Sequence, residues 1–327
     1  ILNLINRYNI EKQRILAINA HKTGDEFSKC SISRFSDRVR AFVKIEDGCD
    51  RFCSYCIIPV SRGRVRSKSL SDLKEEIDNL AQSGINEIVL VGINLSAYGK
   101  NEDFNIVDAV KTCAQNESIM RVRLGSLEPD HITEDIISEL SKIDKFCPQF
   151  HISLQSGCDK TLKNMNRHYS SDEYRQLCSL IRNTFEDASV TTDVMVGFHE
   201  ETEEDFYDSL AFVKEIRFEK VHVFPYSQRE GTNASKKGDS VSKKEKEHRA
   251  EIMINETENI RKEYFHSLIN KTVCVLFENE PEKGIYQGYT KNYTPVRLSS
   301  EKDIIGKEMN VVITDATDEY CISTLLP

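Results

Sequence analysis

The sequence lacks the apolar segments that would place it in a membrane or direct it out of the cell. No stretch comes near the roughly 18 uninterrupted apolar residues of a membrane-spanning helix, so we expect no membrane association. No basic segment followed by an apolar run opens the chain, so we expect no signal peptide and a cytoplasmic location. The chain begins at Ile1 rather than Met, and we expect that the N-terminal part of a longer protein is missing.

The composition is that of a folded protein. With 39% hydrophobic and 30% charged residues, the chain is too apolar to be disordered. Its 327 residues favour one main domain with a smaller companion. Ten cysteines without a secretory signal indicate a reducing compartment, where clustered thiols are more often metal ligands than disulfides.

Charge is distributed unevenly along the chain. The net charge of -9 argues against a nucleic-acid partner, but residues 1–68 carry 14 Lys and Arg against 7 Asp and Glu. A basic N-terminal part on an acidic body could steer a polyanion to one place. Uneven but solvated surface charge explains the same counts equally well.

From residue 41 onward, segments typical of buried strands alternate with helical patterns. The predicted strands are rich in Val, Ile and Leu and cover 41–45, 87–91, 121–125, 150–154, 190–196 and 220–224. Helical patterns cover 71–82 (with Ser71 as a candidate N-cap), 104–115, 133–142, 171–183 and 202–216. Six βα units predict an α/β fold with a parallel sheet, and they suit a partial (βα)6 barrel better than a closed eight-unit barrel.

The residue pattern of the rest of the chain differs from that of the α/β part. We expect a linker at residues 1–40 and the α/β domain at 41–232. A connecting segment with one long helix (243–268) is predicted at 233–268, and a small domain at 269–327. That small domain shows five short strand patterns, at 272–277, 284–290, 294–298, 309–314 and 320–325. Such a pattern predicts a small all-β barrel of the oligonucleotide-binding kind.

Three cysteines just after the first predicted strand carry the chemical signal. Cys49, Cys53 and Cys56 follow a C-x3-C-x2-C spacing, and no second pair of C-x2-C hooks completes a zinc site. Three thiolates on a 4Fe–4S cluster leave one iron open, where the amino and carboxylate groups of S-adenosylmethionine can bind. The alternative is a zinc site that borrows Cys30 or a histidine as its fourth ligand.

With Tyr55 as the aromatic residue of C-x3-C-x-aromatic-C, the loop resembles the radical S-adenosylmethionine superfamily. Further strings are similar to its methylthiotransferases, above all Leu-Gly-Ser-Leu-Glu-Pro at 124–129, Leu-Gln-Ser-Gly at 154–157, Met-Asn-Arg at 165–167 and His-Val-Phe-Pro-Tyr-Ser at 222–227. Gly-Tyr-Thr-Lys-Asn-Tyr at 288–293 resembles the C-terminal TRAM domain of that family. These motifs are most similar to those of the branch that acts on tRNA threonylcarbamoyladenosine beside the anticodon.

The resemblance implies a radical reaction with two clusters. Family members add a methylthio group at C2 of the adenine. One S-adenosylmethionine methylates a sulfur of an auxiliary cluster, and a second yields the 5′-deoxyadenosyl radical. The auxiliary cluster sits on three cysteines of an N-terminal domain that this sequence does not contain. Our hypothesis is that the chain cleaves S-adenosylmethionine but does not insert sulfur. The resemblance also implies an electron donor such as flavodoxin or ferredoxin, and we expect a monomer.

Other predicted site residues lie at or near the ends of the predicted strands. Gly92 and Asn94 are placed like the superfamily segment that meets the methionine amino group, although a simple turn explains Gly92 equally well. Hydrogen bonds to the ribose, carboxylate or adenine of S-adenosylmethionine are predicted for Glu128, Ser153, Gln155 and Asp193. Gly197 fits a close approach of the backbone to adenine. The Pro-Gly that the family has after Phe198 is replaced by His199 and Glu200, so we expect a different turn there and a surface position for His199.

Two groups of residues are candidates for binding RNA. Phosphate contact with the anticodon arm is predicted for the basic string after the cysteine loop, which consists of Arg62, Arg64, Arg66 and Lys68. Stacking and gripping of a single-stranded loop are predicted for Tyr289, Lys291, Tyr293 and Arg297 of the small barrel, where tyrosines are as often core. Two other functions stay open: a ribosomal-protein methylthiotransferase, and a non-catalytic RNA-binding module with a structural metal.

Overall fold

A computed structural model describes residues 2–16, 25–28 and 39–326 of the chain. Within the predicted linker, the described part begins with helix α1 (Leu2–Glu11). Residues 17–24 and 29–38, which include Cys30, lie outside the described residues.

The strands of the α/β part form two parallel sheets that meet at a break in one strand. The first sheet has the order β1 (Arg40–Lys44), β4 (Glu87–Val91), β5 (Arg121–Leu124). The second has the order β6 (Ser126–Leu127), β7 (Gln149–Ile152), β8 (Ser189–Val196), β9 (Lys220–Pro225). Only Gly125 separates β5 from β6, and its N–H donates to the backbone oxygen of Leu90 at 2.8 Å. The predicted third strand therefore changes neighbours at Gly125, and the predicted partial barrel is confirmed.

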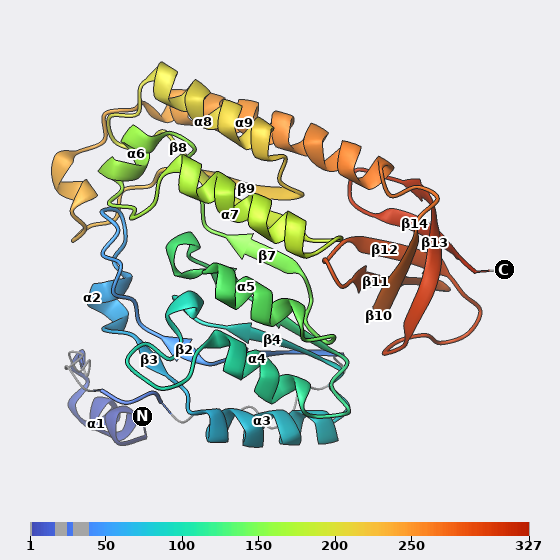
Figure 1. The fold of residues 1–327 in the computed structure, drawn as a ribbon. Coiled ribbons are helices and arrows are strands. Elements are labelled where there is room, and N and C mark those ends of the chain that lie inside the picture. The colour runs from blue at the N-terminus through green and yellow to red at the C-terminus, as the bar shows by residue number, and fades with distance from the viewer. Residues whose placement is uncertain (1, 17–24, 29–38, 327) are drawn as a thin grey trace.

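Helices cover one face of these sheets (Figure 1). They are α3 (Leu70–Gln82), α4 (Ile106–Ala114), α5 (Glu134–Ser141), α7 (Ser171–Thr184) and α8 (Glu203–Ile216). In β1, Ala41 and Val43 are fully buried in the core beneath the helices, whereas Phe42 is 43% exposed. Helix α3 is capped by Ser69, whose Oγ accepts from the N–H of Asp72 at 3.1 Å, and not by Ser71 as predicted.

Several short elements complete the α/β part. They are β2 (Glu46–Asp47), which pairs antiparallel with β3 (Arg66–Ser67), and the helices α2 (Ile58–Arg62) and α6 (Asp159–Asn164). These segments are too short to show a period in the sequence. They nevertheless build the surroundings of the three cysteines.

The C-terminal part is a closed five-stranded barrel that follows the long helix α9 (Lys243–His266). Its strand order is β10-β11-β12-β14-β13, with the bounds β10 (Thr272–Glu282), β11 (Ile285–Thr290), β12 (Pro295–Ser299), β13 (Glu308–Ala316) and β14 (Cys321–Leu325). A separate core, which includes Phe277, Val296 and Ile313, fills the barrel. The predicted small all-β barrel is confirmed.

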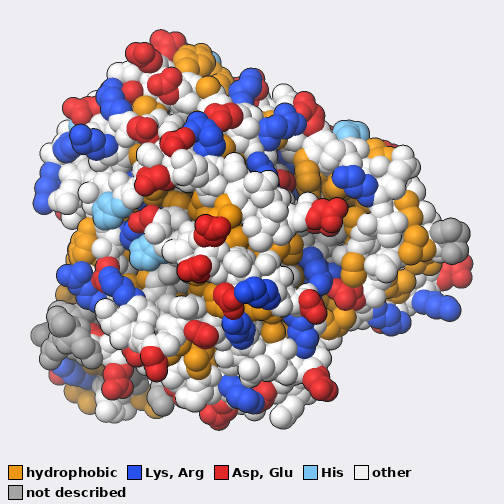
Figure 2. Space-filling view, viewed as in Figure 1, with side chains coloured by type: hydrophobic (Ala, Val, Ile, Leu, Met, Phe, Trp, Pro, Cys, Tyr) orange, Lys and Arg blue, Asp and Glu red, His pale blue; other side chains and the backbone are white. Residues whose placement is uncertain are grey.

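The small barrel lies at one end of the parallel strands, and the segment between β2 and α2, which carries the three cysteines, lies at the other (Figure 1). The barrel contacts the strands where they begin: Arg121, the first residue of β5, donates to the backbone oxygens of Tyr289 and Cys274. Acidic and basic side chains intermingle over the helix-covered face (Figure 2). None of the described helices is long and apolar enough to cross a membrane.

Candidate active site

The three cysteines lie on one loop, residues 48–65, which we call the cysteine loop. It leaves the sheet after β1 and is closed at its base by the β2–β3 pair. Gly48 has φ +89°, and a Cβ there would lie 2.0 Å from the backbone oxygen of Arg64. Only glycine allows this close crossing of the two ends of the loop. The N–H of Cys49 then donates to the backbone oxygen of Gly63 at 3.0 Å.

The three thiols share a partly buried environment. Cys53 is 8% exposed, and Cys49 and Cys56 are half-buried. Burial raises the pKa of Cys49 to about 11 and raises the pKa of Cys56 as well. The charge of Cys53 contributes to both shifts, so the three sulfurs are electrostatic neighbours. Without a bound metal the Cys49 and Cys56 side chains are thiols at neutral pH, and binding of iron would displace their protons.

This donor set fits an iron–sulfur cluster. Three thiols from one loop can hold three irons of a 4Fe–4S cluster, whose ligands are spread around the cluster and do not meet at one point. Among the residues that the structure describes, no three His, Cys, Asp or Glu groups are arranged to hold a single metal ion. The zinc alternative takes Cys30 or a histidine as its fourth ligand, and of these Cys30 lies outside the described residues.

A second segment, residues 164–167, supports the cysteine loop from behind. Ser54 donates through its N–H to the Met165 oxygen and through its Oγ to the Asn164 oxygen, both at 2.9 Å. The amide of Asn166 donates to the Phe52 oxygen at 3.0 Å, and Nη1 of Arg167 donates to Cys53 Sγ at 3.2 Å. The Met-Asn-Arg string, to which the sequence assigned no role, is therefore the support of the cysteine loop.

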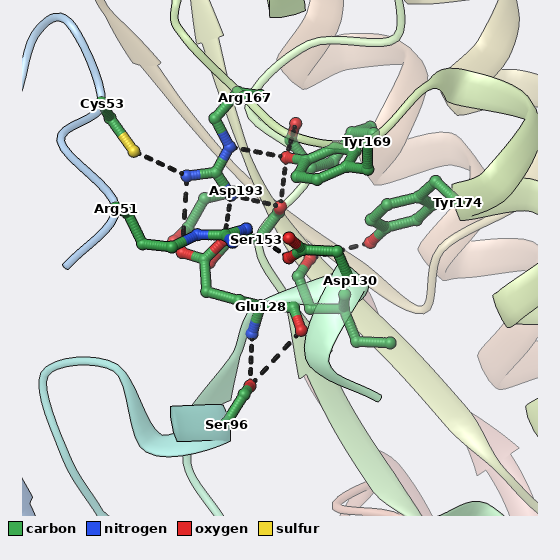
Figure 3. A network of polar contacts seen from close by, with 12 residues as sticks. Arg51, Cys53, Ser96, Glu128, Asp130, Ser153, Arg167, Tyr169, Tyr174 and Asp193 are labelled. Atoms are coloured by element: carbon green, nitrogen blue, oxygen red, sulfur yellow. Dashed lines mark hydrogen bonds and ion pairs between the residues drawn. The ribbon is translucent and has the colours of Figure 1, made fainter. Parts of the chain in front are cut away.

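Arg167 also belongs to a network of charged groups beside Cys53 (Figure 3). Glu128, which follows β6, receives hydrogen bonds from Arg167 and from Arg51 of the cysteine loop. Arg51 also forms a bidentate pair with Asp130. The carboxylate of Glu128 is thus held between two guanidinium groups, and its Oε2 lies 3.4 Å from Nη2 of Arg51. From the sequence we predicted a hydrogen bond between Glu128 and S-adenosylmethionine, and we did not predict these ion pairs.

Asn94 and Gln155 each bury a polar side-chain atom near a strand end that has no hydrogen-bond partner among the described residues. Oδ1 of Asn94, after β4, and Oε1 of Gln155, after β7, are both buried without a hydrogen bond. Gln155 also has φ +66°, a conformation that L-residues adopt at a cost and that is concentrated at binding sites. Because a buried acceptor without a donor costs about 1–3 kcal/mol, a ligand that donates hydrogen bonds fits here. The amino group and ribose hydroxyls of S-adenosylmethionine are such donors.

The other predicted cofactor residues have partners within the protein. A Cβ on Gly92 would lie 2.7 Å from Oε2 of Glu46, so this glycine makes room for a buried carboxylate. The backbone oxygen of Ser153 accepts from Arg167 and Tyr169, and Oδ2 of Asp193 lies 3.3 Å from Nε2 of His151. Roles for these residues toward a cofactor stay predictions.

The turn after β8 corrects the expectation for His199, and the predicted role of Gly197 toward adenine stays a prediction. Gly197 has φ +68°, and a Cβ there would lie 2.3 Å from Cγ of Lys246, so the space above this glycine is filled by helix α9. His199 is not a surface residue, because its side chain is 11% exposed and its Nδ1 is buried. Glu200 has φ +62°, a left-handed conformation that glycine adopts more readily than a residue with a Cβ. Phe198 packs on Tyr55 with ring centres 6.2 Å apart, which places the Tyr55 ring in an apolar cluster beneath the loop.

All four residues of the basic string form ion pairs, with Asp47, Asp50 or Glu76, and they divide into exposed and buried side chains. The side chains of Arg62 and Arg64 are 51% and 64% exposed, and both stay candidates for phosphate contact. Arg66 is 11% exposed and pairs with Asp47. Lys68 is 4% exposed and forms an ion pair with Glu76, so its prediction as an RNA contact is corrected to a structural role.

The predicted RNA-binding residues of the small barrel lie largely at its junction with the sheet. Tyr289 and Tyr293 stack on each other with ring centres 4.5 Å apart, and the guanidinium of Arg40 lies over both rings. Lys291 donates to the Asp144 oxygen at 2.8 Å. These contacts account for the three residues structurally, and we do not include them in an RNA surface. Arg297 lies on the barrel over the ring of Tyr320, and a role in RNA binding stays a prediction.

Comparisons with known proteins agree with this geometry. The model of the Radical SAM superfamily matches residues 43–213. Threonylcarbamoyladenosine tRNA methylthiotransferase MtaB of Bacillus subtilis is 33% identical over 326 residues, which cover 98% of this chain and 72% of that protein. A tRNA-2-methylthio-N(6)-dimethylallyladenosine synthase of Endomicrobium trichonymphae is 36% identical over 313 residues, covering 96% of this chain and 74% of that protein.

A solved structure supports the fold alone. The coproporphyrinogen III oxidase HemN of Escherichia coli, a radical SAM enzyme, superposes with a TM-score of 0.52 at 14% sequence identity. The match covers 79% of this chain and 68% of that chain.

Proposed function

The chain belongs to the radical S-adenosylmethionine superfamily and, within it, to the tRNA methylthiotransferases, and on this premise we propose that it modifies the threonylcarbamoyladenosine beside the anticodon. The modification is a methylthio group at C2 of the adenine. One observation carries the proposal: the cysteine loop presents three thiols at the carboxyl end of a parallel partial barrel, where such folds place their chemistry.

The residues that would hold the cofactors can be named. Cys49, Cys53 and Cys56 would bind a 4Fe–4S cluster, and Asn94 and Gln155 would meet S-adenosylmethionine with their unpartnered oxygens. When bound, the cluster supplies the electron that breaks a C–S bond of the sulfonium. The segment at residues 164–167 holds the cysteine loop in place, so that little reorganisation accompanies this step.

The face of the second sheet that the helices leave uncovered carries polar side chains, which fit a substrate base with a polar substituent. In β9, Val221 and Val223 pack into the core, so Lys220 and His222 face the other way. His222 lies beside Asp193 in the register of β8 and β9. A threonylcarbamoyl group carries a carboxylate and a hydroxyl that such side chains can bind, whereas a dimethylallyl group is apolar. This face therefore favours the substrate named for the relative in Bacillus subtilis over that named for the relative in Endomicrobium trichonymphae.

Binding of the anticodon arm would use Arg62 and Arg64, which are exposed on the cysteine loop. We further propose a cytoplasmic monomer that receives electrons from a flavodoxin or ferredoxin. The family's auxiliary cluster needs three more cysteines, and the remaining described ones lie apart on six segments: Cys113, Cys147, Cys158, Cys178, Cys274 and Cys321. We propose that the described residues serve the cleavage of S-adenosylmethionine and the removal of hydrogen from the base.

Isotope transfer tests the proposal. The reconstituted chain is incubated anaerobically with dithionite, S-adenosylmethionine and a tRNA that carries deuterium at C2 of the target adenine. We expect deuterium in the 5′-deoxyadenosine with the threonylcarbamoyl tRNA, and much less with a matched dimethylallyl tRNA. If deuterium were transferred from a deuterated ribosomal protein and not from the tRNA, the substrate would be the ribosomal protein. If the chain held zinc, bound tRNA and did not cleave S-adenosylmethionine, it would be an RNA-binding module and not an enzyme.

A further inference from the structure

We propose that Arg167 sets the reduction potential of the cluster through its hydrogen bond to the sulfur of Cys53. The inference rests on the proposed function, because it presupposes that Cys53 ligates an iron–sulfur cluster. It assigns a role to a residue outside the cysteine loop, which neither the loop motif nor the names of the relatives specify. Arg167 acts through Cys53 and is therefore a positioning and tuning residue rather than a catalytic one.

The guanidinium of Arg167 is held on all sides. Arg167 is 8% exposed, and its Nε donates to the hydroxyl of Tyr169 at 2.9 Å. Nη1 reaches Cys53 Sγ at 3.2 Å, and Nη2 donates to the Ser153 oxygen at 3.3 Å and to Glu128. A planar group with this many fixed partners cannot turn away from the sulfur without losing several hydrogen bonds.

The sulfur is fixed relative to Arg167 by the same segment. Ser54, the neighbour of Cys53, is bound to the oxygens of Asn164 and Met165, and Asn166 binds the oxygen of Phe52. Donor and acceptor are therefore positioned by residues directly adjacent to each of them in the chain. The contact between Arg167 and Cys53 is built into the support of the loop and does not depend on a mobile side chain.

Charge determines the direction of the effect. One-electron reduction adds a negative charge to the cluster and its thiolates, and a buried cation at the sulfur stabilises that charge. Hydrogen bonds to ligating sulfurs and nearby charges are among the factors that set cluster potentials. Arg167 therefore raises the potential. Glu128, which pairs with Arg167, brings a negative charge to the same place and opposes this effect.

Arg51 supplies a matched control within the same network (Figure 3). Arg51 is 7% exposed as a whole residue, against 8% for Arg167, and binds the carboxylates of Glu128 and Asp130, so it resembles Arg167 in burial and shares Glu128 with it. Its partners are carboxylates, whereas Arg167 reaches the sulfur itself. A comparison of the two arginines separates the hydrogen bond to sulfur from the general field of a nearby cation.

The test is the reduction potential of the reconstituted cluster, measured by electron paramagnetic resonance during titration in the absence of S-adenosylmethionine. Arg167→Met should shift the potential to more negative values, and Glu128→Gln should shift it to more positive values. Arg51→Met should give a clearly smaller negative shift than Arg167→Met. Equal shifts in the two arginine variants, or no shift in Arg167→Met, would overturn the inference.

Two further arms keep the outcome decisive. If Arg167→Met does not retain iron, Arg167→Lys and Arg51→Lys are compared instead, with the larger shift expected in Arg167→Lys because the shorter side chain loses the contact with sulfur. A weakened affinity for S-adenosylmethionine with an unchanged potential would make Arg167 a cofactor ligand and overturn the tuning role. If the wild-type chain binds no cluster, the proposed function fails as well. A loaded wild-type cluster with unshifted variants refutes this inference alone.

Discussion

At the scale of single residues, two carboxylates near the cysteine loop have opposite environments. Glu128 lies between the guanidinium groups of Arg51 and Arg167. Glu46 is fully buried, and its Oε2 accepts from the backbone N–H of Asn94 at 2.7 Å, while its Oε1 has no hydrogen-bond partner in the described part of the chain. Burial raises the pKa of Glu46 to about 7, against an ordinary value of 4.5, and nearby Asp47 adds to the shift while Lys44 opposes it. Glu46 is therefore protonated in the folded chain at mildly acidic pH.

Glu46 should make the stability of the chain depend on pH. Because its folded pKa lies above its unfolded value, its stabilising contribution is complete below about pH 4.5 and is lost as the pH rises through about 7. At about 1.4 kcal/mol per pKa unit, the loss is on the order of 3 kcal/mol. Glu46→Gln should be more stable than the wild type at pH 8 and similar at pH 5, as measured by chemical denaturation. Parallel curves for both proteins from pH 5 to 8 would contradict this.

The basic string should separate into two kinds of residue. Arg64→Ala should weaken tRNA binding and reduce the slope of log affinity against log salt by about 1, with folding stability changed by less than about 0.5 kcal/mol. Lys68→Met removes the opposite charge from buried Glu76 and should cost about 3 kcal/mol of stability. Salt-dependent binding and denaturation of both variants check this. A loss of tRNA affinity in a stably folded Lys68→Met variant would reinstate Lys68 as an RNA contact.

At the scale of elements, the turn between β8 and α8 carries a strained residue. Glu200 has φ +62°, and its N–H donates to Ser240 Oγ at 2.8 Å. A left-handed conformation costs a residue with a Cβ roughly 1–2 kcal/mol, whereas glycine adopts it freely. The backbone of the turn therefore imposes a conformation that its own sequence does not favour.

Glu200→Gly should stabilise the chain. Relief of the left-handed strain exceeds the entropy that glycine loses on folding, and the net gain should be about 0.5–1 kcal/mol. Glu200→Ala is the matched control, because it removes the same side chain and keeps the strain. Thermal and chemical unfolding of the two variants measure the difference. An equal effect of both substitutions would show that the backbone conformation is not the cause.

Local patterns predicted the elements that depend on local sequence. The buried strands could be read from short runs of Val, Ile and Leu, and the cysteine loop from its spacing and its place after the first strand. The break at Gly125 could not be predicted, because it depends on which strands flank β5 and β6. The contact of Arg167 with Cys53 was missed for the same reason, since the two residues are 114 positions apart in the chain. Glu76 is only eight residues from Lys68, but that pair depends on how β3 and α3 pack against each other. The sequence alone does not show which charged groups will lie beside a given side chain in the fold.

At the scale of the whole molecule, the small barrel is fastened to the beginning of the parallel strands. Arg121 is fully buried and donates to Glu308 and to the backbone oxygens of Tyr289 and Cys274. Strands of five to eight residues separate this junction from the cysteine loop, which is a distance of roughly 15–25 Å. A substrate that touches both ends must therefore be extended, as a tRNA arm is.

Arg121 should couple the stabilities of the two barrels. Arg121→Met leaves two backbone oxygens and Glu308 without their buried donor and should cost about 2–4 kcal/mol. Calorimetry should then show a broadened or divided unfolding transition. Lys291→Met, which removes a more exposed contact at the same junction, should cost less than about 1 kcal/mol. A single unshifted transition in Arg121→Met would contradict the coupling.

The central claim is that the cysteine loop holds a cluster that cleaves S-adenosylmethionine. Its most direct test is anaerobic reconstitution with iron and sulfide, reduction with dithionite, and measurement of 5′-deoxyadenosine, with Cys53→Ala as the control. We expect a brown wild-type protein that forms 5′-deoxyadenosine and a Cys53→Ala variant that forms none. Stoichiometric zinc without iron, or a correctly loaded cluster that yields no 5′-deoxyadenosine, would contradict it.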